Sequence, residues 1–218
     1  RYNAGGAVIT TFLGTEHRRD ALRGADFVIN AIQVGGYKPA TVADFEIPKR
    51  YGLRQTIADT LGIGGIFRGL RTIPVLLEIA DEMERVAPEA ILLNYTNPMA
   101  IVTGAVLHAT SVPTVGLCHS VQVCAPRLVD ALEIPVDDLR WKIAGINHMA
   151  WLLEVRDGER DLYPEIKRLA AEKNRKARKN PAKRHDDMVR YEMMRLFGYY
   201  VTESSEHNAE YTPFWIKS

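Results

Sequence analysis

The sequence predicts an α/β fold: a Rossmann-like, mostly parallel sheet followed by the start of an α+β domain. Short apolar runs alternate with segments of helical spacing, as in chains that wind helices around a parallel sheet. Residues 26–32 form a continuous apolar run, as expected for a strand that is covered on both faces. Polar residues follow these runs, and ligands of open α/β sheets bind beyond the carboxyl ends of the strands.

The expected elements follow one another along the chain. A first strand is expected at residues 7–11, and Thr15 offers an N-cap for a charged helix that ends before Gly24. Further strands are expected at 26–32, 90–94, 114–117 and 141–146, with 149–155 either continuing the last one or forming a partner strand. Helices are expected at 66–86 and from Pro98 through 107.

The composition is that of an ordinary globular protein. Hydrophobic residues make up 46% and charged residues 25%, and the net charge of +1 favours neither nucleic acid nor an anionic membrane as partner. The apolar runs are too short to span a bilayer, and no signal-peptide pattern opens the chain. Two cysteines are too few for a disulfide framework, so we expect a reducing compartment, the cytoplasm.

Residues 167–184 differ from the rest, because they hold nine basic residues and one acid, Glu172. We expect a solvated helix or a mobile insertion. A nucleic-acid surface would need interleaved aromatic residues and a basic domain around it.

Polar side chains at four strand ends are expected to form one site. They are Asn30 with Gln33, Asn94 with Asn97, Cys118 with His119, and Asn147 with His148. A thiolate and an imidazole suit a divalent metal, although thiolate selects zinc more often than manganese. Since Cys118 and His148 lie thirty residues apart, a buried cysteine and a hydrogen-bonded histidine remain an alternative. Asn97 can hold a nicotinamide or substrate, or cap a helix with Pro98 at its first position.

Two further segments have the composition of a site. Glycines at 62, 64 and 65 precede a helix and permit a ligand to approach the backbone closely. No G-x-G-x-x-G fingerprint occurs, so the first strand–turn–helix unit is expected to lie upstream of Arg1. The short span 202–213 contains Glu203, Glu206, His207, Glu210 and Tyr211. It can form a polar loop, an exposed helix start or a functional site. A tyrosine acts as a base there only if a neighbouring cation lowers its pKa from about 10.

Six segments, in order, resemble glycoside hydrolase family 4, specifically its α-galactosidase (melibiase) type. They are NAIQVGGY (30–37), QTIADTLGIGGIFRGLR (55–71), LNYTNPM (93–99), VGLCHSV (115–121), GINHMA (145–150) and VTESSEHNAEYTP (201–213). The resemblance implies oxidation of the sugar at C3 by NAD, removal of the C2 proton, elimination of the aglycone and addition of water. A Mn²⁺ ion would bind the C2 and C3 oxygens.

The resemblance also implies roles for individual residues. Cys118 and His148 would hold Mn²⁺, and Tyr211 would be the base, with Tyr199 and Tyr200 as alternatives. His119 would assist departure of the aglycone and favours an unphosphorylated sugar. NAD contacts are expected at Asn30, Gln33 and Asn97, and sugar contacts at Asp59, Asn97 and Asn147.

The domain organisation follows from the same resemblance. Residues 1–118 would form part of an NAD-binding domain, and 119–218 part of a catalytic domain with a basic insertion around 167–184. The expected partner is a small carbohydrate, and the expected assembly a homo-oligomer. The chain by itself is expected to bind NAD poorly and to turn over little or nothing.

Other functions compete with this interpretation. Within the family, α-glucosides and α-galacturonides or α-glucuronides are alternative substrates. A uronate would need a cation near C6, and Arg68 or Arg71 can be mistaken for that cation from the sequence alone. An NAD-dependent 2-hydroxy-acid dehydrogenase shares the sheet and the Asn-Pro helix start but needs no metal. A non-catalytic sugar or nucleotide sensor and a nucleic-acid protein acting through residues 167–184 are less consistent with the candidate site.

Overall fold

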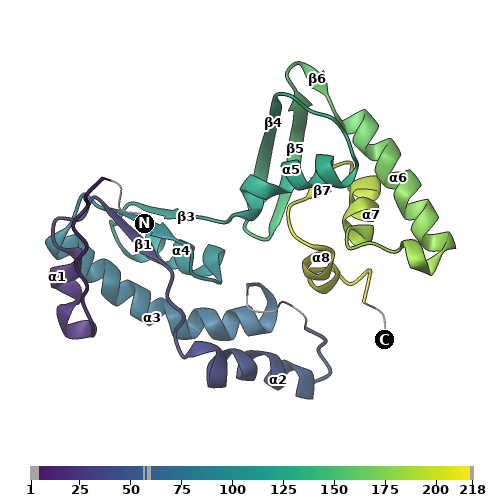
Figure 1. Ribbon diagram of the computed structural model, residues 1–218. Coiled ribbons are helices and arrows are strands. Elements are labelled where there is room, and N and C mark those ends of the chain that lie inside the picture. The colour runs from purple at the N-terminus through teal and green to yellow at the C-terminus, as the bar shows by residue number, and fades with distance from the viewer. Residues whose placement is uncertain (1–4, 56, 58–59, 217–218) are drawn as a thin grey trace.

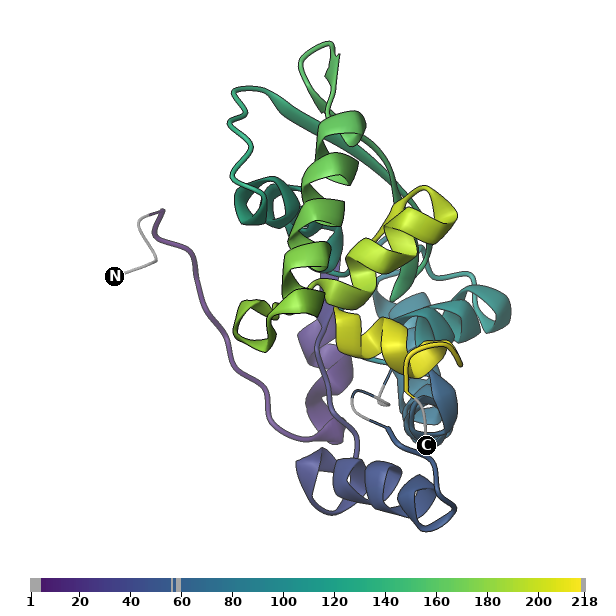
Figure 2. The same ribbon diagram turned by 90° about the vertical axis from the view of Figure 1, so that its right-hand side faces the viewer.

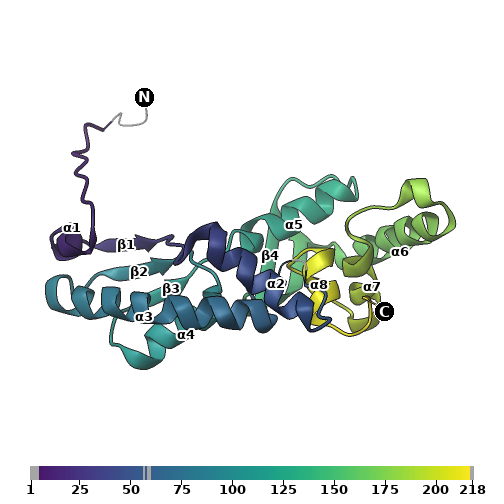
Figure 3. The ribbon, with the colours of Figure 1, turned by 90° about the horizontal axis from the view of Figure 1, so that it is seen from below.

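The computed structural model describes residues 5–55, 57 and 60–216, which form two sheets, each with its own helices and hydrophobic core. Figures 1 and 3 show the two halves lying end to end, with the chain crossing from one to the other after β3. The α/β fold with a parallel sheet, followed by an α+β part, is therefore confirmed.

The first sheet is parallel, as predicted, and has the order β1-β2-β3. Its strands are β1 (Phe27–Asn30), β2 (Ile91–Asn94) and β3 (Thr114–Gly116). Residues Asn30 and Asn94 are register partners, so the strands end side by side. The helical segments of this half are η1 (Thr15–His17), α1 (Arg18–Leu22), η2 (Gly36–Thr41), α2 (Val42–Arg50), α3 (Gly62–Val86) and α4 (Met99–Ala109).

The first core lies on one face of this sheet. Leu76, Ala80 and Met83 follow one another at helical spacing along α3 and are fully buried. They form one cluster with Leu92 of β2 and with residues of α4. On the other face, Phe27 is 63% and Ile29 68% exposed, so the prediction that both faces of this strand are covered is wrong for the described residues.

Two predictions near the N-terminus are also wrong. Residues 7–11 belong to neither sheet but run as an exposed, extended segment that leaves the body of the molecule (Figure 2). A β-rich composition does not make a strand unless a neighbouring strand offers backbone partners, and none of the described strands does so here. Thr15 is the first residue of η1, and neither η1 nor α1 has a side-chain cap.

The second sheet is antiparallel. It contains β4 (Leu139–Ile146), β5 (Met149–Asp157), β6 (Arg160–Asp161) and β7 (Tyr200–Val201), with β6 and β7 both pairing with β5. The predicted segment 149–155 is thus a partner strand, and it does not join the parallel sheet. A two-residue turn connects β4 to β5, and only antiparallel neighbours can be joined so tightly.

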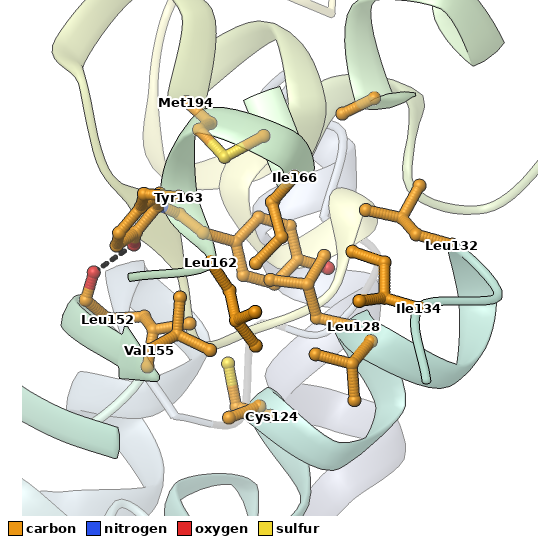
Figure 4. Packing of buried hydrophobic residues seen from close by; sticks show 14 of the residues in the cluster. Cys124, Leu128, Leu132, Ile134, Leu152, Val155, Leu162, Tyr163, Ile166 and Met194 are labelled. Atoms are coloured by element: carbon orange, nitrogen blue, oxygen red, sulfur yellow. Dashed lines mark hydrogen bonds between the residues drawn. The ribbon is translucent and has the colours of Figure 1, made fainter. Parts of the chain in front are cut away.

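The second core packs between this sheet and its helices. These are α5 (Ser120–Ala131), α6 (Tyr163–Lys179), η3 (Pro181–Lys183), α7 (Met188–Phe197) and α8 (Ser205–Tyr211). Figure 4 shows Leu128, Leu152, Ile166 and Met194 converging on one another from four elements. The Tyr163 hydroxyl donates to the Leu152 carbonyl and accepts the N–H of Tyr200 at 3.1 Å, which ties α6 to β5 and β7.

The basic stretch 167–184 forms most of α6 together with η3. Ile166, Ala170 and Ala177 form the buried face of α6, while the charged residues lie towards solvent. Lys176 pairs with Glu172 at 2.7 Å, and Arg178 pairs with Glu192 of α7 at 2.6 Å. The expectation of a solvated helix is therefore confirmed. No helix in the described part of the chain has both the length and the apolarity needed to cross a membrane.

Candidate metal centre and its surroundings

Three side chains with metal-binding atoms converge where the two halves of the molecule meet. One ligand atom each from Cys118, His148 and Glu203 lies within 4.8 Å of the others. The Oε1 atom of Glu203 is 3.9 Å from Cys118 Sγ and 3.8 Å from His148 Nε2. A thiol, an imidazole and a carboxylate form a donor set that suits a divalent transition metal.

Each of these residues is placed by the end of a strand. Cys118 lies two residues beyond β3 of the parallel sheet, and Glu203 lies two residues beyond β7 of the antiparallel sheet. His148 is the second residue of the turn between β4 and β5, with a φ of 62°. Tight hairpin turns need positive φ, and a non-glycine residue held in this region is often part of a functional site.

The burial of Glu203 is the strongest sign that a cation belongs here. Its side chain is only 8% exposed, and an unpaired carboxylate is costly to bury. Its carboxylate lies within 4.0 Å of Cys118, His148 and His207, and none of these three side chains carries a permanent positive charge. A divalent ion at this position would compensate the carboxylate and use all three donors.

Arg190 of α7 fixes the backbone that leads to Glu203. Its guanidinium donates to the carbonyl oxygens of Val201 and Thr202, at 3.0 and 3.1 Å, and lies 4.2 Å from the centre of the Tyr200 ring. It also pairs with Asp187 at 2.9 Å. The end of β7 is therefore held in place by hydrogen bonds from the Arg190 side chain.

Helix α8 connects the metal-binding cluster to Tyr211. Ser204 caps the helix by accepting the N–H of His207, and its hydroxyl also lies 2.8 Å from His207 Nδ1. The ring of His207 packs against the rings of His148 and Tyr211, with centroid distances of 4.9 and 5.8 Å. Residues 207 and 211 lie one turn apart, so they share one face of the helix.

Tyr211 lies against the loop that precedes α3. Its hydroxyl is 2.5 Å from Thr60 Oγ1, and the neighbouring carboxylate of Glu210 accepts the N–H of Ile57 at 2.8 Å. A cavity of about 430 Å³ opens beside Tyr211. It is lined by Leu53, Arg54, Gln55, Leu61, Gly62, Ile63, Met149, Glu210 and Tyr211.

Three other predicted site residues lie close to the cluster or at the sheet edge. His119 follows Cys118 directly and is exposed at the start of α5, and Asn147 is half-buried beside His148. Asn97 is half-buried, and its Oδ1 accepts the N–H of Met99 at 3.2 Å. The residue before α4 is Pro98, so this helix begins one residue later than expected.

The structure places the remaining predicted residues at the edge of the parallel sheet and around β7. Asn30 is buried and donates to Asn94 Oδ1 at 2.7 Å, within the edge of the sheet. Gln33 is exposed and donates to Thr41 Oγ1 at 3.0 Å. Tyr200 is buried under Arg190, and Tyr199 packs on Tyr163. Asp59 lies outside the described residues. The NAD and sugar contacts assigned to these residues stay predictions.

Cys118 and Cys124 differ in their surroundings, although both are free cysteines. Cys124 is 3% exposed in the second core, and burial raises the pKa of its thiol to about 11. It therefore remains a protonated thiol at neutral pH, which cannot act as a metal ligand. Cys118, half-buried beside Glu203, is the cysteine that can do so.

The sequence did not identify the roles of Glu203 and Thr60. Glu203 is one of three glutamates between 203 and 210, and nothing in their spacing shows which one is turned inward. The only local signal is the Tyr-Val pair before it, which forms β7 and ends at the metal-binding cluster. Thr60 has no local signal, since its partner lies 151 residues away.

Two family models together match almost the whole chain. The model of the family 4 glycosyl hydrolases matches residues 1–134, and that of the family 4 glycosyl hydrolase C-terminal domain matches residues 143–217.

Relatives of known name and structure agree with these matches. An α-galactosidase from Bacillus subtilis is 65% identical over 93% of this chain, and an α-galactosidase from Rhizobium meliloti is 37% identical over 95% of it. The aligned parts are 45% and 41% of those proteins, so the chain spans about half the length of the curated relatives it matches. A 6-phospho-α-glucosidase from gut microorganisms, solved with NAD and Mn²⁺, is 25% identical, with a TM-score of 0.70 over 89% of this chain and 45% of that one.

Proposed function

Because the chain belongs to family 4 of the glycosyl hydrolases, we propose that the whole protein hydrolyses α-galactosides with NAD and Mn²⁺ as cofactors. The relative that is 65% identical is an α-galactosidase, which supports this substrate. The related 6-phospho-α-glucosidase was solved with both cofactors, which supports NAD and Mn²⁺.

One observation carries the proposal: Cys118, His148 and Glu203 bring their ligand atoms together beside the helix that ends at Tyr211. The cluster offers the charge and donor atoms for one divalent ion. For NAD, the carboxyl edge of the parallel sheet presents Gln33 and Asn97, where nucleotides bind to open α/β sheets. The residues present are therefore suited to both groups.

The chemistry is divided between the cofactors and the side chains. When bound, NAD would supply a hydride acceptor for C3 of the sugar, and Mn²⁺ would supply Lewis-acid polarisation of the sugar oxygens. Tyr211 takes the proton from C2, which the neighbouring ketone has made acidic. His119 donates a proton to the departing aglycone oxygen, and Asn147 orients the sugar beside the metal-binding cluster. Cys118, His148 and Glu203 hold the ion.

The substrate is proposed to be a neutral, unphosphorylated galactoside. A uronate would need a free cation near C6, and Arg71 is one of the residues that could be mistaken for it from the sequence alone. Arg71 is bound to Asp44 through two hydrogen bonds of 3.1 and 2.7 Å, and its Nε donates to the Val34 carbonyl. Its charge is therefore already compensated within the fold.

The test is hydrolysis of p-nitrophenyl α-galactoside by the full-length protein, with and without NAD and Mn²⁺ under reducing conditions. We expect activity only with both cofactors. Cys118→Ser should abolish the response to Mn²⁺, because it removes a thiolate ligand. Cys124→Ala is the matched control, since it removes a thiol outside the site and should keep the metal requirement.

Activity that does not depend on NAD and Mn²⁺ would overturn the proposal. Hydrolysis of glucosides or uronides in its place would keep the mechanism and change the substrate. We further propose a reducing compartment, the cytoplasm, because the cluster needs Cys118 as a free thiolate. A homo-oligomeric assembly is proposed as well.

A further inference from the structure

A short contact between Thr60 and Tyr211 links the first half of the chain to α8. Thr60 Oγ1 and the Tyr211 hydroxyl are 2.5 Å apart, and Thr60 is only 3% exposed. Such a distance is at the short end for a bond between two hydroxyl groups and is usual when one oxygen carries negative charge. Since a hydroxyl can both donate and accept, Thr60 can bond the oxygen of Tyr211 as a phenol or as a phenolate.

The hydroxyl proton of Thr60 has one competing acceptor among its described contacts. The Ile57 carbonyl oxygen is 3.5 Å away, at the limit for a hydrogen bond. A threonine hydroxyl has one proton to donate and two lone pairs to accept with. When Tyr211 is a phenolate, the Thr60 proton is directed to it. When Tyr211 is a phenol, Thr60 can accept the phenolic proton and turn its own towards Ile57.

The position of Thr60 is fixed by the first turn of α3. A Cβ atom at Gly65 would lie 2.9 Å from the Thr60 carbonyl carbon and 3.2 Å from its oxygen, so only glycine lets the helix approach this closely. A second contact holds the same loop to α8, because the Ile57 N–H donates to Glu210 at 2.8 Å. The sequence suggested that the glycine-rich turn lets a ligand approach the backbone. In the structure, Gly65 of this turn instead lets the helix pack closely against Thr60.

We propose that Thr60 is a positioning residue for Tyr211, holding the phenolic oxygen in place while it receives the C2 proton. This inference rests on the proposed function, which supplies the C3 ketone. The C2–H bond breaks, its proton goes to the oxygen of Tyr211, and its electron pair moves towards the C3 carbonyl. Thr60 keeps its own proton throughout and acts only by orienting and stabilising the phenolate.

The experiment compares wild type with Thr60→Val in the full-length protein. Valine keeps the shape of threonine but removes the hydroxyl. We expect kcat to fall roughly 10- to 100-fold, the effect of one hydrogen bond to a charged group, with KM little changed. Galactosides carrying deuterium at C2 or at C3 show which step is slowed. The C2 isotope effect on kcat should rise, while the C3 effect should fall.

Two further variants separate positioning from loss of structure. Thr60→Ser retains the hydroxyl and should restore kcat and the wild-type isotope effects. Thr72→Val is the matched control, because Thr72 is equally buried in α3 and bonds only the Arg68 carbonyl in the described structure, at 2.7 Å. It should leave both isotope effects unchanged. The Mn²⁺ affinity of all variants, measured by electron paramagnetic resonance, should equal that of wild type.

The possible outcomes separate a failure of the Thr60 role from a failure of the proposed function. If wild type in D₂O forms galactose without deuterium at C2, the proposed function fails and this inference with it. If wild type incorporates deuterium but Thr60→Val keeps the wild-type kcat and isotope effects, Thr60 has no such role. A loss of kcat that Thr60→Ser does not restore would also overturn the inference.

Discussion

The two cysteines show how much the surroundings of a single side chain decide its chemistry. Cys118 lies half-buried beside the carboxylate of Glu203, whereas Cys124 is enclosed between β7 and the second core. Burial raises the pKa of Cys124 to about 11, so its thiolate is scarce at ordinary pH. Only the thiolate reacts with alkylating agents.

We predict that iodoacetamide at pH 8 modifies Cys118 in the folded chain well before Cys124. Mn²⁺ should slow the modification of Cys118, because the ion occupies the sulfur. Mass spectrometry of the peptides gives both rates. Unfolding in urea is the control and should make the two rates similar. Equal rates in the folded chain would contradict the burial argument.

At this scale the sequence predicted a pair of ligands but not the full cluster. Cys118 and His148 could be placed together because each follows an apolar run, and strand ends collect polar ligands. Three glutamates lie in this segment, and selecting Glu203 as the third ligand requires a tertiary contact. Arg190 binds the two carbonyl oxygens that precede Glu203 and so fixes the backbone there. That contact joins separate elements, so no local pattern reveals it.

Among the elements, the β4–β5 hairpin matters most, since its turn carries His148. Gly145 next to this turn has a φ of 134°, and a Cβ there would lie 2.6 Å from Ala150 Cα and 2.9 Å from the Met149 carbonyl oxygen. These are backbone atoms of the partner strand, which cannot rotate away. The hairpin thus depends on glycine at this position.

We predict that Gly145→Ala destabilises the fold by roughly 3 kcal/mol or more, from backbone strain and the clash combined. It should also weaken Mn²⁺ binding, because His148 moves with the strand. Urea unfolding and a Mn²⁺ titration measure the two effects.

Gly158→Ala is the control for this change. Gly158 also has positive φ, 55°, but nothing lies within 4 Å of a Cβ built there. It should cost about 1 kcal/mol and leave metal binding intact. A similar loss of stability in both variants would show that the positive φ, and not the clash with β5, causes the destabilisation.

Which apolar runs become strands depends on whether a neighbouring strand pairs with them. Apolar runs located β1, β2 and β3, and helical spacing located α3, which begins four residues earlier than expected. Residues 7–11 have strand composition but no neighbouring strand in the described sheets. The segments 141–146 and 149–155 were expected as strands, but composition alone does not show pairing direction, and the structure pairs them as an antiparallel hairpin.

Across the whole molecule, the two cores differ in what they enclose. The cluster around α3 and α4 consists of aliphatic side chains and a methionine. The cluster around α6 and α7 encloses Cys124, Tyr163, Tyr191 and Tyr200, and burial raises the pKa of all four. The folded second half therefore keeps protons that the unfolded chain releases near pH 9 to 10.

We predict that alkaline pH destabilises the second half selectively. Stability should be constant below about pH 9 and fall above it, since only the unfolded chain then ionises these groups. Cys124, with its pKa raised from 9.0 to about 11, contributes about 2–3 kcal/mol to this loss. All three tryptophans, Trp141, Trp151 and Trp215, belong to this half, so their fluorescence in urea titrations from pH 7 to 11 reports on it.

Tyr191→Phe provides the control for the alkaline transition. In the described structure the Tyr191 hydroxyl is buried without a hydrogen-bond partner. Its removal should leave stability at pH 7 almost unchanged or higher and should make the alkaline loss smaller. An unchanged pH dependence would show that Tyr191 is not among the groups responsible.

The spacing of the metal-binding cluster along the chain bears on how the protein is made. Cys118 and Glu203 are 85 residues apart, and His148 lies between them in a different strand pair. The ribosome synthesises the chain from its N-terminus, so Glu203 emerges last of the three, after the hairpin, α6 and α7. No shorter nascent segment holds all three donors. Binding of the proposed ion would therefore require that translation has passed Glu203 and that both halves have come together.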